Sequence, residues 1–222
     1  MAGFLAAKRP AKPPFLIGIC GAGSGSGKTA MAEELLSEAA RRGVPEVKAS
    51  ASHDNFRETP GGSGHPAAGP WGAIKFTKTG IYTSVVTSPE VLREEGKDTA
   101  RVLKAGAVRA VWVSSPGGAD LEEALRMAMD HLEGCSVVLV EGNSAVELLK
   151  PDIVIFMSAS FFKSGAEAAL RGADIVFRPE GACIPAEIIR KDAVFCGSLE
   201  LCADEVFKRM PGIDGKGTVT ED

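Results

Sequence analysis

The stretch FLIGICGAGSGSGKT, residues 15–29, decides the fold. Its first six residues form a continuous apolar run, which is typical of a strand buried on both faces of a parallel sheet. Residues 22–29 match the pattern G-x-x-x-x-G-K-[S/T], with Ala22 in place of the first glycine. Apolar residues at helical spacing then continue to Arg42. The motif therefore lies between a strand and a helix, which is the structural context that this pattern requires.

The residue types of this loop suit the binding of a chain of phosphates. Glycines allow the backbone to fold around an anion with its amides pointing inward, and the N-terminus of the following helix adds a partial positive charge. The ammonium of Lys28 can reach the β- and γ-phosphates of a nucleotide, and the hydroxyl of Thr29 can ligate Mg²⁺. The predicted nucleotide-binding residues are Gly23, Ser24, Gly25, Ser26, Gly27, Lys28 and Thr29.

Strand and helix patterns alternate along the chain. The predicted strands cover 15–20, 73–77, 82–87, 109–114, 136–140, 152–157, 174–177 and 194–196, and the predicted helices cover 28–42, 98–106, 121–132, 166–170 and 199–210. Such alternation predicts β-α-β units and hence a parallel sheet. The expected fold class is α/β, a three-layer P-loop NTPase fold with a mostly parallel sheet and helices on both faces.

Three segments lie outside this alternation. Residues 1–14 contain three prolines and are predicted to be a flexible leader. Residues 45–70 hold four prolines and four glycines, and we expect a loop insertion there, within a P-loop nucleotide-binding domain of residues 15–210. A substrate-binding flap is the alternative for this insertion. Residues 211–222 are predicted to be a disordered tail.

Composition argues against several classes of function. The 222 residues carry a formal net charge of −4 and 6% aromatic residues, which disfavours a broad nucleic-acid surface and a base-stacking platform. No apolar run reaches the ~18 residues of a membrane-spanning helix, so no membrane contact is expected. The five cysteines are odd in number and form no C-x-x-C motif. A disulfide framework is therefore not expected. The sequence instead predicts a cytoplasmic location.

Acidic residues that could hold Mg²⁺ accompany two of the predicted elements. Glu141 ends the apolar strand 136–140, where a metal-binding carboxylate is expected beside a phosphate-binding loop, although a surface glutamate at a strand end is the alternative. Asp98 could bind the metal or its water, and it could also simply cap a helix. The predicted catalytic residues are Lys28, Asp98 and Glu141, and the predicted metal ligands are Thr29, Glu141 and Asp98.

Two further sets of residues each have two interpretations. Lys75 and Lys78, at the end of a predicted strand, could contact a second phosphate or an anionic substrate, or they could be solvated. Cys183, Cys196 and Cys202 could bind Zn²⁺ or an iron–sulfur cluster with a fourth ligand. Their spacing matches no template, so a structural role is favoured for these three cysteines.

Several short motifs follow one another along the chain. After the phosphate-binding loop come AIK at 73–75, GKDTAR at 96–101, KAGA at 104–107 and VLVEG at 138–142. In this order they resemble the molybdopterin-guanine dinucleotide biosynthesis protein B (MobB) family of P-loop GTPases, over about residues 15–157. The sequence departs from that family in having Phe76-Thr77-Lys78 where the family usually has histidines. It also contains no Asn-Lys-x-Asp motif for reading guanine.

The resemblance implies binding of GTP and Mg²⁺, weak GTP hydrolysis, a homodimer, and a protein partner in molybdenum cofactor biosynthesis. It places Gly27, Lys28 and Thr29 at the phosphates and the metal, and it matches Glu141 and Asp98 to acidic residues of the family. ATP stays open as the nucleotide. Two other functions stay open as well: a small-molecule kinase on the same scaffold, and a non-catalytic nucleotide-binding regulatory protein.

Overall fold

The computed structural model describes residues 13–43, 69–163 and 165–211. In chain order the elements are β1 (Phe15–Gly21), α1 (Lys28–Arg41), β2 (Trp71–Lys78), β3 (Ser84–Val86), α2 (Pro89–Leu92), α3 (Asp98–Lys104), β4 (Arg109–Ser115), α4 (Ala119–His131), β5 (Val137–Glu141), α5 (Asn143–Leu149), β6 (Ile153–Met157), α6 (Glu167–Arg171), β7 (Ile175–Phe177), the 3₁₀ helix η3 (Ala186–Ile188), β8 (Val194–Cys196) and α7 (Leu199–Arg209). The leader, insertion and tail predicted from the sequence fall outside the described residues, apart from 13–14, 69–70 and 211.

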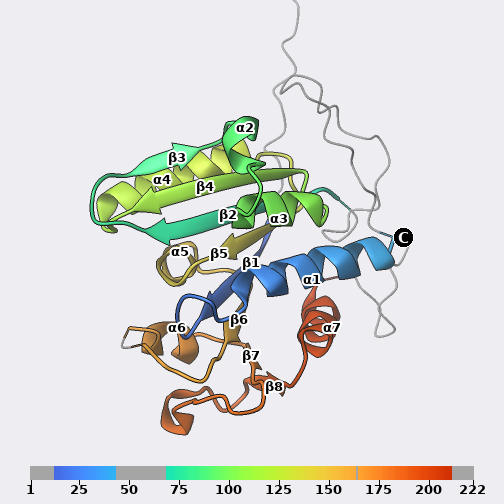
Figure 1. Cartoon of the computed structure of the whole chain (residues 1–222). Helices are drawn as coiled ribbons and strands as arrows, with labels where there is room; N and C mark the ends of the chain where they lie inside the picture. The colour runs from blue at the N-terminus through green and yellow to red at the C-terminus, as the bar shows by residue number, and fades with distance from the viewer. Residues whose placement is uncertain (1–12, 44–68, 164, 212–222) are drawn as a thin grey trace, which may run out of the picture.

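The strands form one eight-stranded sheet in the order β3-β4-β2-β5-β1-β6-β7-β8 (Figure 1). All neighbouring strands run parallel except the pair β3 and β4. Strand β1 lies inside the sheet, where Ile17 is paired with Leu139 of β5 on one side and with Ile153 of β6 on the other. The outermost strands, β3 and β8, are three residues long. Because parallel strands end at one edge of the sheet, the residues that follow β1, β2 and β5 are brought together there.

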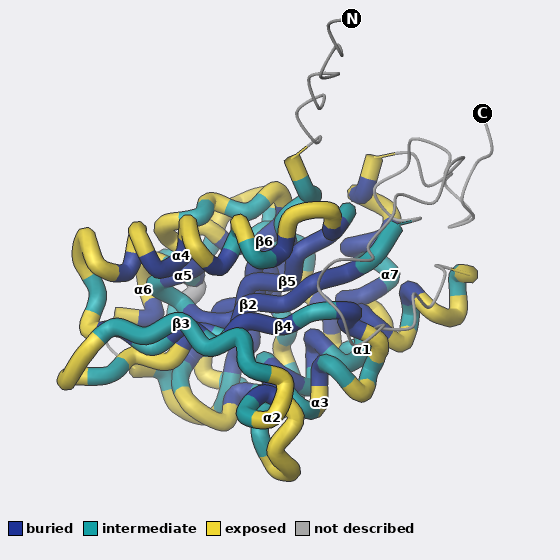
Figure 2. The backbone as a smooth tube through the Cα atoms, turned by 90° about the horizontal axis from the view of Figure 1, so that it is seen from above, coloured by how far each residue is buried: buried dark blue, intermediate teal, exposed yellow. Residues whose placement is uncertain are grey.

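Apolar residues of each inner strand alternate between two cores. Leu139 of β5 packs in the core that is completed by α1, α3 and α7, whereas its neighbour Val140 packs in the core completed by α4, α5 and α6. Figure 2 shows the buried strands between these two helical layers. The sheet is thus the middle of three layers, and the predicted α/β fold with a mostly parallel sheet and helices on both faces is confirmed.

The predicted elements differ from the observed ones in a few places. The predicted strand 82–87 is the short β3, and it pairs antiparallel with β4 instead of extending the parallel part of the sheet. Helices α2 and α5 were not predicted, because four and seven residues are too short to show a helical period. The start of α5 has a different signal, since Gly142 just before it has φ +129°, a conformation that favours glycine.

Helix α7 packs against Trp71 of β2 and against Arg42, the C-cap residue of α1. The rings of Trp71 and Phe207 stack with their centroids 5.8 Å apart, and the guanidinium of Arg42 lies 4.7 Å from the centroid of the Phe207 ring. Arg42 also pairs with Asp204 of α7 at 2.6 Å. These contacts join the last helix of the described chain to the helix that follows the phosphate-binding loop.

Replacing Phe207 by alanine should lower the free energy of unfolding by about 3–5 kcal/mol, because Phe207 is fully buried and its removal leaves a cavity. Urea unfolding followed by circular dichroism measures this. The matched control is Leu201→Ala on the same helix, where the side chain is 55% exposed and the change should stay within about 0.5 kcal/mol. Equal losses in the two variants would contradict the docking contact.

Candidate functional site

The loop between β1 and α1 is fixed by backbone hydrogen bonds to the last residue of β6 and to the segment that follows this strand. The N–H of Ala22 donates to the carbonyl of Met157 at 3.0 Å, and the N–H of Lys163 donates to the carbonyl of Ala22 at 3.1 Å. Within the loop, Gly25 and Gly27 have φ of +74° and +88°, which residues with side chains rarely adopt. These glycines let the chain turn sharply from the strand into the helix.

Gly27 is the N-cap residue of α1, and no side chain of the described residues caps the helix there. The first amides of α1 therefore remain available to a ligand in the loop, as in anion sites at helix N-termini.

The side-chain amide of Asn143 clamps the entry of the loop. Its Oδ1 accepts a hydrogen bond from the N–H of Gly21 at 2.9 Å, and its Nδ2 donates to the carbonyl of Gly21 at 3.0 Å. The sequence analysis missed this residue. Its available signal was its position two residues after Glu141, because β5 pairs with β1 and the ends of these strands meet at the loop.

The ammonium of Lys28 is held across the loop by neutral groups. It donates to the carbonyl of Gly23 at 2.7 Å and to the hydroxyl of Ser26 at 3.2 Å. Burial lowers the pKa of Lys28 from its usual value, and the negative charge of Glu141 opposes this effect only in part. In the described part of the chain, no carboxylate forms an ion pair with Lys28. A half-buried cation with neutral partners is suited to receive an anion.

Glu141 and Thr29 meet at the inner side of the loop. Only 5% of Glu141 is exposed, so the alternative of a surface glutamate at a strand end is wrong. The hydroxyl of Thr29, in the first turn of α1, is 3.2 and 3.1 Å from the two carboxylate oxygens of Glu141 and is placed to donate to them. The structure thus brings together two of the three predicted metal ligands.

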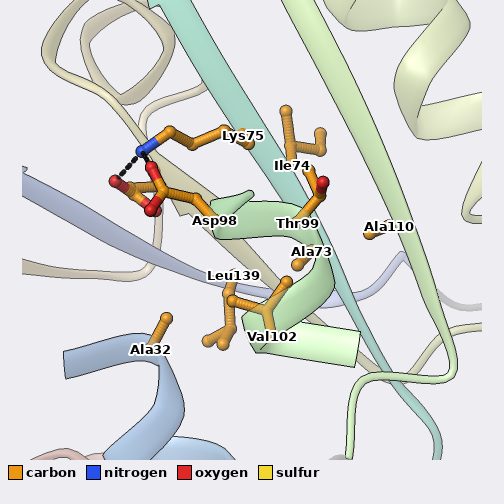
Figure 3. A pocket seen from close by; sticks show the side chains of 10 residues that line it. Ala32, Ala73, Ile74, Lys75, Asp98, Thr99, Val102, Ala110 and Leu139 are labelled. Atoms are coloured by element: carbon orange, nitrogen blue, oxygen red, sulfur yellow. Dashed lines mark hydrogen bonds and ion pairs between the residues drawn. The ribbon is translucent and has the colours of Figure 1, made fainter. Parts of the chain in front are cut away.

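The third predicted ligand, Asp98, is joined to them by Lys75. Lys75 lies on β2 directly beside Glu141 in the sheet register, and its ammonium forms ion pairs with Glu141 and with the Oδ2 of Asp98, the latter at 2.6 Å (Figure 3). Asp98 is the first residue of α3, and it follows the N-cap residue Lys97, whose side chain makes no capping hydrogen bond. Asp98 therefore does not occupy the N-cap position of α3, although it is an acidic residue in the first turn of that helix.

The charges of this cluster stabilise one another. Burial alone would lower the pKa of Lys75, but the charge of Glu141 and hydrogen bonds to Asp98 and Glu141 outweigh burial, so the pKa of Lys75 is raised. Burial alone would raise the pKa of Asp98, but the hydrogen bond from Lys75 and the positive charge of Lys75 oppose it, and the pKa of Asp98 is lowered. Both shifts favour the charged forms at neutral pH.

A small pocket opens beside the cluster, between α1, α3 and the sheet (Figure 3). Its floor is apolar, and the charged side chains of the cluster lie at one side. The lining residues are Ala32, Ala73, Ile74, Lys75, Asp98, Thr99, Val102, Ala110, Leu139 and Glu141.

Other candidate residues are not part of this arrangement. Lys78 is exposed, and the alternation of β2 places it on the opposite face of the sheet from Lys75. Cys183 is exposed, whereas Cys196 and Cys202 are buried. Across residues 13–43, 69–163 and 165–211, no group of three or more His, Cys, Asp or Glu side chains is placed to hold a metal ion.

The fold and the loop together define a class. A glycine-rich G-K-T loop between the first strand and the first helix, in a parallel sheet covered by helices on both faces, is the three-layer α/β fold of P-loop NTPases.

Comparisons with known proteins give the following. No protein-family model and no curated protein sequence matches the chain. Similar solved structures include the signal recognition particle 54 kDa protein from Aeropyrum pernix K1 in complex with GDP (17% identity, TM-score 0.43, 86% of this chain covered) and a LAO/AO transport system kinase (16%, 0.44, 88%). A zinc-bound triple mutant of the YjiA GTPase is a third (12%, 0.34, 91%). The chain spans about half the length of these structures, namely 43%, 57% and 55%.

Within the described residues, no helix combines the length and the apolar character that crossing a bilayer requires.

Replacing Asn143 by alanine should lower the free energy of unfolding by about 1–3 kcal/mol, because the variant leaves the N–H and the carbonyl of Gly21 without their partner. Chemical denaturation measures the loss. Ser144→Ala, one residue further along α5, serves as the control and should be close to wild type. If the two variants were equally stable, Asn143 could not be a clamp of the loop.

The thiols should differ strongly in reactivity. Burial raises the pKa of Cys20 to about 12 and that of Cys135 to about 11, whereas Cys183 is exposed. Iodoacetamide at pH 8 should therefore modify the native protein mainly at Cys183, and Cys183→Ser should remove most of the labelling. Unfolded protein should be modified at all five cysteines. Mass spectrometry would refute this ranking by finding native Cys20 labelled as fast as Cys183.

Proposed function

We propose that the chain binds a nucleoside triphosphate together with Mg²⁺ and hydrolyses it slowly. One observation carries the proposal: among the described residues Lys28 makes its hydrogen bonds to neutral partners within the glycine loop, while the adjacent Thr29 contacts the buried carboxylate of Glu141. A cation and helix amides are thus directed at one place, and oxygen ligands for a metal lie next to it. This is the pair of requirements that a magnesium-bound triphosphate imposes.

The donor set fits Mg²⁺. A hydroxyl oxygen and carboxylate oxygens are the ligands that this ion prefers, and it is commonly held by one or two carboxylates together with phosphates. Thr29 and Glu141 would hold the ion, with Asp98 as a second carboxylate directly or through water. When bound, Mg²⁺ would neutralise charge on the phosphate oxygens.

Other residues of the chain would bind the phosphates and stabilise charge. Backbone amides from Gly23 to Thr29 would bind the phosphates, and Lys28 would stabilise the negative charge of the transferring phosphoryl group. Arg101 is engaged by Glu33 at 2.6 Å and lies 3.9 Å from Asp98. It therefore does not present a free guanidinium to the phosphates, and turnover should be slow unless a partner supplies one.

We infer further that the nucleotide is GTP, with ATP as the alternative, and that the chain acts in molybdenum cofactor biosynthesis. The support is the resemblance to the MobB family together with the placement of its motifs. AIK, GKDTAR and VLVEG lie far apart in the sequence, yet they contribute Lys75, Asp98 and Glu141 to one cluster beside the loop. A protein partner, a homodimer and a cytoplasmic location stay predictions.

Lys28→Ala should abolish binding of magnesium nucleotides in isothermal titration calorimetry, because it removes the cation that the loop provides for the phosphates. A ligand at about 100 times its dissociation constant should stabilise the wild type by ~2.7 kcal/mol, so a thermal-shift panel of GTP, ATP and their diphosphates gives an independent reading. Lys78→Ala, an exposed lysine on β2, is the control and should bind like wild type. Unchanged affinity in Lys28→Ala would contradict the site.

The same samples separate the three kinds of activity. Release of inorganic phosphate without an added acceptor supports the slow hydrolase. Transfer to one compound in a panel of metabolites would instead identify a small-molecule kinase. Tight binding without either product would identify a non-catalytic nucleotide-binding protein.

A further inference from the structure

The ion pairs of Lys75 give the metal site an unusual charge balance. The ammonium lies between the carboxylates of Asp98 and Glu141, the two acidic residues proposed to hold Mg²⁺ (Figure 3). Lys28 forms no ion pair with either carboxylate among the described residues, but it interacts electrostatically with both, so two ammonium groups act on two carboxylates. The cluster therefore has no net negative charge with which to attract a divalent cation on its own.

We propose that Lys75 is a resident cation of the metal site, which together with Lys28 offsets the charges of Glu141 and Asp98 and so makes Mg²⁺ binding conditional on the nucleotide. Lys75 is in this sense a positioning residue. The inference rests on the proposed function only for the identity of the metal and of the phosphate ligand.

The backbone holds Lys75 in this role. Its strand β2 lies inside the sheet, where Lys75 is paired with Trp112 of β4 on one side and with Glu141 of β5 on the other. Only 19% of its side chain is exposed, so the ammonium is confined to the space between the carboxylates. A cation fixed there repels a second cation unless added negative charge compensates.

The polyphosphate of a nucleotide supplies that negative charge. The side chain of Glu141 is 7% exposed and already contacts Thr29, whereas that of Asp98 is 40% exposed and stands at the start of α3. Glu141 can therefore exchange its ion pair with Lys75 for coordination of a metal that binds together with the phosphates. Lys75 then remains paired with Asp98. Lys75 then prevents occupation by the metal alone and orients Asp98 when the complex is bound.

The test uses Mg²⁺ without nucleotide. In wild type, millimolar MgCl₂ should change the melting temperature no more than NaCl of equal ionic strength does. Lys75→Met, which keeps an unbranched side chain one atom shorter and removes its charge, should be less stable in NaCl. Mg²⁺ should raise its melting temperature by about 5 °C or more at saturation, because binding to the folded state stabilises it. Lys75→Arg and Lys78→Met should behave like wild type.

A Mg²⁺-induced shift in wild type equal to that in Lys75→Met would overturn the inference, and so would the absence of a shift in Lys75→Met. If Lys75→Met does not fold in NaCl, the double variant Lys75→Met/Glu141→Gln should fold, and Mg²⁺ should not change its melting temperature. In that case Mg²⁺ should restore folding of the single variant, and failure to do so would also overturn the inference. Because this readout needs no nucleotide, its failure is distinct from a failure of Lys28→Ala to lose nucleotide binding.

Discussion

Glu141 brings a carboxylate to the carboxyl end of β5, where only 5% of the residue is exposed. A buried charge is tolerated only when other groups compensate it. Here the compensating groups come from two other elements, the hydroxyl of Thr29 from α1 and the ammonium of Lys75 from β2. The requirement to satisfy one carboxylate therefore ties the helix that follows the loop to the centre of the sheet.

The loop itself is fixed at both ends by different means. At its entry, Asn143 and the carbonyl of Met157 hold the backbone of Gly21 and Ala22. At its exit, the contact of Thr29 with Glu141 holds the first turn of α1. Between these ends Gly25 and Gly27, both with positive φ, set the turn. Such a loop is organised before a ligand arrives, so that less ordering is required on binding.

Much of the fold could be predicted from the sequence because the inner strands are short apolar runs separated by helical patterns. The loop at 22–29 was found because its glycines and its Lys28-Thr29 pair occur in a pattern with a known structural context. The clustering of Glu141 with Thr29 followed from the rule that parallel strands end at one edge. The ion pairs of Lys75 could not be predicted, because they depend on which strand lies beside β5, and the sheet order is not encoded in local periodicity. Asn143 was missed for the same reason.

The inner strands of the sheet run parallel, and its two edge strands are short. β3 and β8 border the described sheet with three residues each, and β3 runs against the direction of the rest. Free amides and carbonyls along an edge strand can pair with a strand of another molecule, and a short edge strand offers few of them. Self-association of this chain by strand addition is accordingly disfavoured at both borders, and side-chain surfaces are left as the more favourable means of pairing two copies.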